Sequence, residues 1–246
     1  VDHRLRGPDG GKLRAIPVWL PFNDPDLVLR ANYSMFDRKT GRPLCVGNGN
    51  TCRRSTVEGV KSLPCPAPEA CALAESGACK PYGRLNVRIG EDDELGTFIF
   101  RTTGFNSIRT LAARLHYLKA VSGSLFAALP LELRLRGKST TQSHGTPIFY
   151  VDLTTRQGSS LAATLEQARE IDAARRAAGF DQEALDAAAR EGFALGAFEE
   201  SAEEGGAVVD EFYPEQGLLT EVAASAPDSS SLGQKLATRV NRLQGG

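Results

Sequence analysis

All five cysteines of this 246-residue chain lie in one short stretch, between Cys45 and Cys79. The stretch is rich in Pro, Gly and Ser and shows little hydrophobic periodicity. A segment of this kind cannot bury enough apolar surface to offset the conformational entropy that it loses on folding. We therefore expect the cysteines themselves to hold the segment in place, and any fold of this chain has to bring them together.

Metal binding is the role that suits these cysteines best. A disulfide framework is disfavoured because their number is odd, the first residues carry no apolar signal sequence, and the chain is long enough to form a core. Unrelated core cysteines would not gather in turn-like sequence. Four thiolates around a Zn²⁺ ion would supply the missing folding free energy. The spacing contains no C-x2-C pair, so an iron–sulfur cluster is the alternative to zinc.

The spacing also suggests which cysteines are ligands. Cys65, Cys71 and Cys79 form a compact set, and the fourth ligand is Cys45 or Cys52. We favour Cys45 because it ends a strand-like run just before a Gly-Asn-Gly turn, whereas Cys52 precedes two arginines that would also stabilise a thiolate. Four thiolates leave no open coordination position, so the expected zinc is structural and not catalytic.

The sequence around the cysteines predicts an α+β fold with antiparallel sheets and one packed helix. The helix is expected at 106–121, where apolar residues recur at spacings of three and four, with Asn106 or Ser107 as N-cap and Gly123 after its end. Extended or alternating apolar runs predict strands at 16–22, 27–36, 83–89, 95–103, 129–139 and 146–156.

The amino-acid composition changes after residue 156, where the sequence becomes rich in Ala. Ala-rich segments at 161–179 and 181–200 predict a helical hairpin, with Gly179 as a helix stop and Asp181 as the next N-cap. Residues from 201 onward are expected to be mostly flexible, apart from a short helix at 232–243. The domains predicted are a cysteine-containing α+β domain at 14–156, a helical hairpin at 158–200 and an acidic tail at 201–246.

The net charge of −1 hides two oppositely charged parts. Residues 1–156 hold 22 Lys and Arg against 14 Asp and Glu, whereas residues 157–246 hold 7 against 16. A basic first part suits an anionic partner, a nucleic acid or an acidic protein surface, or contact with the acidic part itself. The alternative is that the charges serve solubility alone. The candidate residues for contacts with a partner or with phosphate are Arg84, Arg88, Arg134, Arg136, Lys138 and His144.

A catalytic site is not apparent. The chain has only three histidines, and His144 lies in a hydroxyl-rich loop beside Gly137, Lys138 and Ser139. That loop is not a phosphate-binding P-loop, because position 132 is Glu where the motif requires Gly. No G-x-S-x-G motif is present, and a cluster of thiols is the opposite of an open catalytic metal site.

Long parts of the basic half resemble one protein family. The strings are CVGNGNTCRR, PCPAPEACALAESGACKPYGRLNV, FIFRTTGFNSIRTLAARLHYLKAVSG and LPLELRLRGKSTTQSHGTPIFYVDL, within residues 14–156. They resemble the recombination directionality factors of phages and integrative elements that use large serine integrases, proteins often labelled "hydrolase or metal-binding protein". The acidic part after 158 lies outside the resemblance.

The resemblance implies an accessory protein and not an enzyme. Such factors bind the integrase, act on its coiled-coil arm, switch it towards excision, and contact DNA weakly or only through the integrase. With no apolar run long enough to span a membrane, we expect a cytoplasmic protein. The alternative from the residues is a zinc-containing DNA-binding or repair protein of a mobile element, and a metal-dependent hydrolase is the third interpretation.

Overall fold

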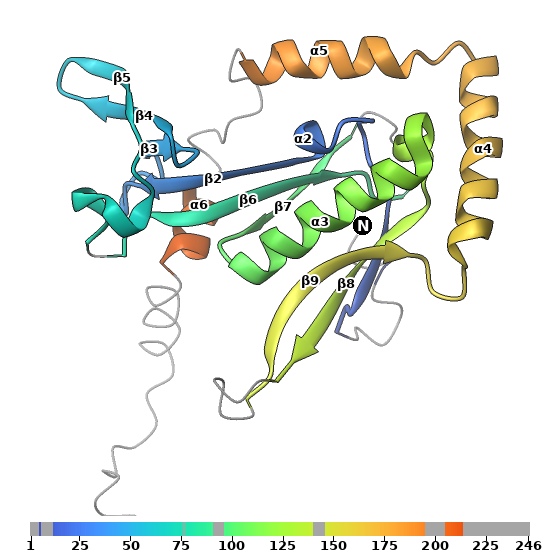
Figure 1. The fold of residues 1–246 in the computed structure, drawn as a ribbon, viewed down its shortest axis with the longest axis horizontal. Helices are drawn as coiled ribbons and strands as arrows, with labels where there is room; N and C mark the ends of the chain where they lie inside the picture. Colours follow the sequence, from blue (N-terminus) through green and yellow to red (C-terminus); the bar gives the residue numbers. More distant parts are fainter. Residues whose placement is uncertain are drawn as a thin grey trace, which may run out of the picture. The chain divides into compact units, whose positions relative to one another are not determined.

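The computed structural model describes residues 12–75, 77–90, 96–139, 146–194 and 205–213, together with Leu5 (Figure 1). The strands are β1 Ala15–Val18, β2 Leu29–Phe36, β3 Pro43–Gly47, β4 Thr51–Thr56, β5 Gly59–Pro64, β6 Lys80–Val87, β7 Phe98–Thr102, β8 Leu131–Lys138 and β9 Ile148–Thr155. The α-helices are α2 Pro25–Val28, α3 Phe105–Ser122, α4 Leu161–Ala177, α5 Gln182–Ala194 and α6 Gly205–Phe212, and the short 3-10 helices are η1 Pro68–Ala70, η2 Ala72–Ala74 and η3 Gly123–Ala128.

Two antiparallel sheets form the framework, which confirms the predicted α+β class. The larger sheet has the strand order β5-β4-β3-β2-β6-β7, and the smaller has the order β1-β8-β9. The sheets are linked at a bridge between Trp19 and Arg88, whose backbone N–H groups each donate to the other residue's carbonyl at 3.0 and 2.8 Å. These two hydrogen bonds satisfy the backbone groups of Trp19 and Arg88 where the sheets meet.

Helix α3 supplies much of the core. Its residues Leu111, Leu115 and Leu118 are buried with apolar side chains of both sheets, among them Leu85 and Leu153. The helix agrees with the predicted 106–121, and Gly123 follows its end with a φ of 58°. The spacing of three and four residues buries one stripe of the helix, as expected for an amphipathic helix on a sheet.

The predicted N-cap of α3 is wrong. Gly104 occupies that position and makes no side-chain capping hydrogen bond. The two polar residues expected to cap the helix lie inside it and bind the β8–β9 pair. Asn106 Oδ1 accepts a hydrogen bond from Lys138 Nζ at 2.9 Å, and Ser107 Oγ accepts from the Val151 N–H at 3.1 Å. Asn106 and Ser107 thus form tertiary hydrogen bonds with β8 and β9 and do not cap the helix.

Regular structure also occurs where the sequence showed no periodicity. Residues 43–64 form β3, β4 and β5, each paired antiparallel with the next. Strand β5 is exposed along almost its whole length, so no buried face imposes an alternation of apolar and polar residues on it. The segment 65–79 fits the expectation better, because the helices or strands among its described residues are the two short 3-10 helices.

The C-terminal helices pack on this framework. The predicted caps are confirmed for α5, since Asp181 Oδ1 accepts from the Ala184 N–H, and for the preceding stop at Gly179, whose φ is 83°. Helix α4 lies against η3 and α5 against α2, and both helices contribute to the core cluster. Figure 1 shows that they run in different directions.

The prediction of a mostly flexible segment from 201 onward is wrong at α6, which is a helix with two fully buried side chains, Val208 and Phe212. Eight residues with mixed composition carry too weak a periodicity to reveal a helix whose stability comes from packing. The chain divides into two units, Val1–Phe212 and Tyr213–Gly246, and α6 belongs to the first. The short helix predicted at 232–243 lies outside the described residues.

The membrane prediction was tested on the same part of the chain. In the ranges that the structure describes, no helix is both long enough and apolar enough to cross a membrane.

Replacing Leu111 by alanine tests the core around α3. Because Leu111 is fully buried, we expect Leu111→Ala to lower the free energy of unfolding by about 2–5 kcal/mol, measured by urea denaturation. The matched control is Tyr117→Ala on the same helix, whose side chain is exposed and whose removal should cost less than about 0.5 kcal/mol. Equal losses for the two variants would contradict the assignment of the buried stripe.

Candidate functional site

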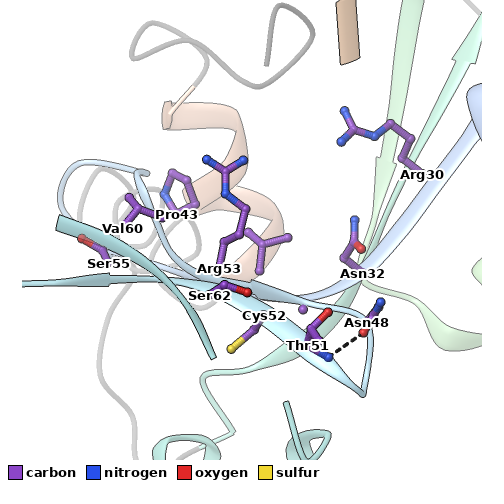
Figure 2. A pocket seen from close by; sticks show the side chains of 12 residues that line it. Arg30, Asn32, Pro43, Asn48, Thr51, Cys52, Arg53, Ser55, Val60 and Ser62 are labelled. Atoms are coloured by element: carbon purple, nitrogen blue, oxygen red, sulfur yellow. Dashed lines mark hydrogen bonds between the residues drawn. The ribbon is translucent and has the colours of Figure 1, made fainter. Parts of the chain in front are cut away.

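Strand alternation gives the six-stranded sheet two different faces. Cross-strand pairing places Cys45 opposite Arg54 and Gly47 opposite Cys52, so both cysteines lie on one face, here called the thiol face. The same alternation sends Arg53 to the other side, here called the arginine face. Figure 2 shows the Arg53 side chain and the Cys52 sulfur pointing in opposite directions from the same strand. The two candidate sites predicted from the sequence are therefore separated by the sheet.

The five cysteines gather at the end of the thiol face that β3 and β4 form. All five are free thiols; Cys52 is buried and the other four are half-buried. Gly47 leaves the space they need, because a Cβ atom at that position would lie 2.8 Å from Cys65 Sγ and 2.8 Å from Cys52 Cβ. Cys52 Sγ also receives a hydrogen bond from Arg54 Nη2 at 3.9 Å. The structure thus brings together residues that are up to 34 positions apart in the sequence.

The thiols oppose one another's ionisation. Burial raises the pKa of Cys79 to about 11, and repulsion from the other four thiolates adds to it. Burial likewise raises the pKa of Cys52, with a hydrogen bond to Cys45 contributing. Because the folded-state pKa of Cys79 exceeds its ordinary value of 9.0, the stability this thiol contributes to the metal-free fold is lost as the pH rises from 9.0 towards about 11.

A cation would reverse this balance, because it favours the thiolates that repel one another in its absence. The donor set consists of soft sulfur ligands, which suit Zn²⁺ or an iron–sulfur cluster. Across the described residues, however, no group of three or more His, Cys, Asp or Glu side chains is arranged so that it could hold a metal ion. The structure therefore brings the thiols within electrostatic reach of one another without a coordination geometry, and the metal stays a prediction.

The arginine face carries a row of like charges. Arg30, Arg84 and Arg101 are direct cross-strand neighbours on β2, β6 and β7. Like charges directly opposite one another destabilise a sheet, since their Cβ atoms lie about 4.5–5.5 Å apart. Aromatic rings offset part of this cost: the Arg30 guanidinium lies 4.6 Å from the centre of the Phe193 ring.

A depression lies beside this row, on the same face of β2, β3, β4 and β5 (Figure 2). Its volume is about 320 Å³, and it is lined in part by Asn48, whose side-chain oxygen accepts from the Thr51 N–H at 2.9 Å. Polar lining comes from Arg30, Asn32, Thr51, Arg53, Ser55 and Ser62, and apolar lining comes from Pro43, Val46 and Val60. The two arginines and the hydroxyl groups suit a carboxylate or a phosphate.

The basic residues predicted on β8 are engaged inside the protein. Arg136 Nε lies 2.6 Å from Asp152 Oδ2, and Arg114 Nε lies 3.0 Å from the other oxygen of the same carboxylate. Arg134 forms an ion pair with Glu132. Both carboxylates are almost completely buried, so each needs a cation to offset its desolvation. These arginines therefore hold the β8–β9 pair in place, and Lys138 bonds to α3 as described above.

The remaining predicted residues are dispersed. Arg84 belongs to the arginine row, whereas Arg88 lines a separate cavity of about 350 Å³ with Trp19 and Arg156, whose guanidinium lies 4.6 Å from the tryptophan ring. His144 lies outside the described residues. The sequence analysis did not predict Arg30 as a site residue. Its pairing with Arg84 in the sheet shows that it belongs to the arginine row.

The close approach at Gly47 yields a test of the thiol cluster. Because an added methyl group would overlap both Cys52 and Cys65, we expect Gly47→Ala to lower the free energy of unfolding by about 1–3 kcal/mol, measured by urea denaturation. The control is Gly206→Ala in α6, where a Cβ atom has open space and the helix should gain about 0.5–1 kcal/mol. Unchanged stability in the first variant would show that the cysteines are not gathered around Gly47.

The comparisons with known proteins agree with the resemblance noted in the sequence. The family model Gp3-like, described as "Recombination directionality factor-like", matches residues 2–156. No curated protein and no solved structure matches the chain significantly. The matched part is more than half of the chain and contains all five cysteines, both sheets and α3. This chain therefore belongs to the recombination directionality factor-like family.

Proposed function

We propose that this protein is an accessory recombination factor that binds a large serine integrase in the cytoplasm and biases it towards excision. The observation that carries the proposal is the family match over the whole of residues 2–156. The arginine face supports it, because a row of three arginines suits the charged outer surface of a coiled-coil arm. The protein would act by differential binding: it shifts the outcome only as far as it prefers one arrangement of the integrase on DNA over another.

A non-catalytic role accords with the state of the buried carboxylates on β8 and β9. Asp152 accepts hydrogen bonds from two arginines, and Glu132 accepts from Arg134 and from the Gln157 N–H at 3.1 Å. A general acid or base needs access to substrate, whereas these two carboxylates are almost completely buried and are neutralised by partly exposed arginines. Their role in this proposal is to keep the β8–β9 pair on α3.

The same proposal assigns a structural Zn²⁺ to the thiol cluster. Cys65, Cys71 and Cys79 would supply three ligands and Cys45 the fourth, with Cys52 as the alternative to Cys45. The mutual repulsion of the thiolates and the space left by Gly47 support a cation at this place. When bound, the ion would tie the loop-rich segment 65–79 to β3 and so fix one end of the six-stranded sheet.

A second candidate function, DNA binding without integrase, is favoured by the arginine row and the hydroxyl-lined depression beside it. Contacts of this kind neutralise phosphates and release counterions, so the affinity would fall steeply with salt. The two candidates differ in whether the integrase is needed for tight association with attachment-site DNA.

Metal analysis tests the zinc assignment. We expect about one Zn²⁺ per chain by elemental analysis, and its loss in Cys65→Ser, Cys71→Ser and Cys79→Ser, because a tetrahedral site needs all four thiolates. Of Cys45→Ser and Cys52→Ser, only one should lose the metal, and the other serves as the matched control. Protein without metal, or with iron in place of zinc, would overturn the assignment.

An excision assay tests the integrase proposal. Adding this protein to the large serine integrase of the same mobile element should raise excision and suppress the joining of attachment sites, since it stabilises one synaptic arrangement. An integrase without its coiled-coil arm is the control and should not respond. If the protein neither binds nor redirects the intact integrase, yet binds DNA alone with steep salt dependence, the second candidate takes its place.

A further inference from the structure

Helix α6 lies on the arginine face, on the opposite side of β6 from α3. The side chain of Phe212 is fully buried, with its ring centre 4.6 Å from that of Phe36 and 5.1 Å from that of Tyr82. The rings of Phe36 and Tyr82 are themselves 5.4 Å apart. Alternation along β6 fixes the side, because Gly83 faces Ile108 of α3 and the neighbouring Tyr82 faces away from it. One aromatic side chain thus anchors α6 between two rings of the sheet.

Polar contacts fix the carboxyl end of the helix. Glu211 Oε1 accepts from the Thr103 N–H at 2.6 Å and from the Thr103 hydroxyl at 3.2 Å. Lys80 Nζ donates to the Phe212 carbonyl oxygen at 2.5 Å. An acidic side chain and a helix C-terminus therefore meet an N–H group, a hydroxyl group and an ammonium group that belong to the sheet and its connection to α3.

The amino end of the helix touches the turn between β2 and β3. A Cβ atom on Gly205 would lie 2.7 Å from the Thr40 carbonyl oxygen, and one on Gly41 would lie 2.4 Å from the Gly205 Cα. Such an approach requires glycine on both sides. The eight residues of α6 therefore run from this turn to the start of α3, and they cover the aromatic pair in between.

The helix and the surface beneath it differ in their relation to the family. The family match ends at residue 156, so α6 lies outside it, whereas Phe36, Lys80, Tyr82 and Thr103 lie within it. Without α6, this part of the sheet would present two aromatic rings bordered by Lys80 and by Arg84, whose guanidinium lies 5.9 Å from the Tyr82 ring. Tyrosine and arginine side chains such as Tyr82 and Arg84 are enriched at the energetically important centre of protein interfaces.

We propose that this surface is the docking site for a helix of the integrase, and that α6 occupies it in the free protein as a built-in substitute. This inference rests on the proposed function. Because α6 would take the partner's place, we expect the partner to resemble it. The partner is then a helix with a large apolar side chain next to a carboxylate, and its C-terminal end lies near Lys80. The partner has to displace α6. The apparent affinity therefore equals the intrinsic affinity multiplied by the fraction of molecules in which the surface is free.

Binding measurements on the full chain test the docking site. The double variant Glu211→Gln, Phe212→Ala loosens α6, and we expect its affinity for the integrase to rise about tenfold if α6 covers the surface in roughly nine molecules of ten. The matched control is Arg190→Gln, which removes the 2.9 Å ion pair between α5 and Asp24 and leaves α6 untouched. Adding Lys80→Glu to the double variant should weaken binding again, because it removes the cation that meets the partner.

The outcomes separate this inference from the function on which it rests. If the unmodified protein does not bind the integrase, the proposed function fails. If it binds but the folded double variant binds equally or more weakly, α6 is only a structural element and the docking site is wrong. Should the double variant be unfolded, hydrogen exchange on the unmodified protein decides: faster exchange of the amides of residues 205–212 on integrase binding supports displacement, and unchanged or slower exchange overturns it.

Discussion

The pairing of β2 with β6 is the constraint on which the rest of the structure depends. Side chains of successive residues leave a strand on opposite faces, so this central pair has to satisfy two different surroundings at once. On one side, Leu29 and Leu85 are directly paired and buried in the core that α3 closes. On the other side, the next pair along is Arg30 with Arg84, and the Phe193 ring of α5 lies 4.6 Å from the Arg30 guanidinium. A slip of one residue would exchange the two sets and bury the arginines in the core.

The same alternation keeps two kinds of chemistry apart. On the thiol face, burial and the neighbouring thiols disfavour the ionisation of Cys52 and Cys79 and so raise the pKa of each. The arginine row lies on the opposite face, where neighbouring positive charges call for anions or aromatic rings. Because the sheet separates them, a metal at the first site would stabilise the platform while the second remained available for partners. One arginine is an exception: Arg54 lies on the thiol face opposite Cys45 and donates a hydrogen bond to Cys52 Sγ at 3.9 Å.

In this structure, charged residues of the basic part and of the acidic part make contacts within the protein. The basic part does not present all of its charge to partners, because Arg134 and Arg136 neutralise buried carboxylates on β8 and β9. The acidic part does not simply trail from the domain, because α5 and α6 place a phenylalanine each on the arginine face, and Glu211 binds at its edge. Contact between the parts was one of the two explanations that the charge asymmetry allowed, and the described residues include several such contacts.

The sequence by itself determined the α+β class, most of the strands β2, β6, β8 and β9, helix α3, the stop at Gly179 and the start of α5 at Asp181. These features arise from local periodicity and from capping residues such as Asp181, so a few neighbouring residues suffice to encode them. Only the tertiary structure decided the strands β3 to β5, the cap of α3, the side on which each arginine lies and the docking of α6. Each of these depends on strand register or on a partner far away in the chain, as Phe212 depends on Phe36 and Tyr82, and no local pattern records such a pairing.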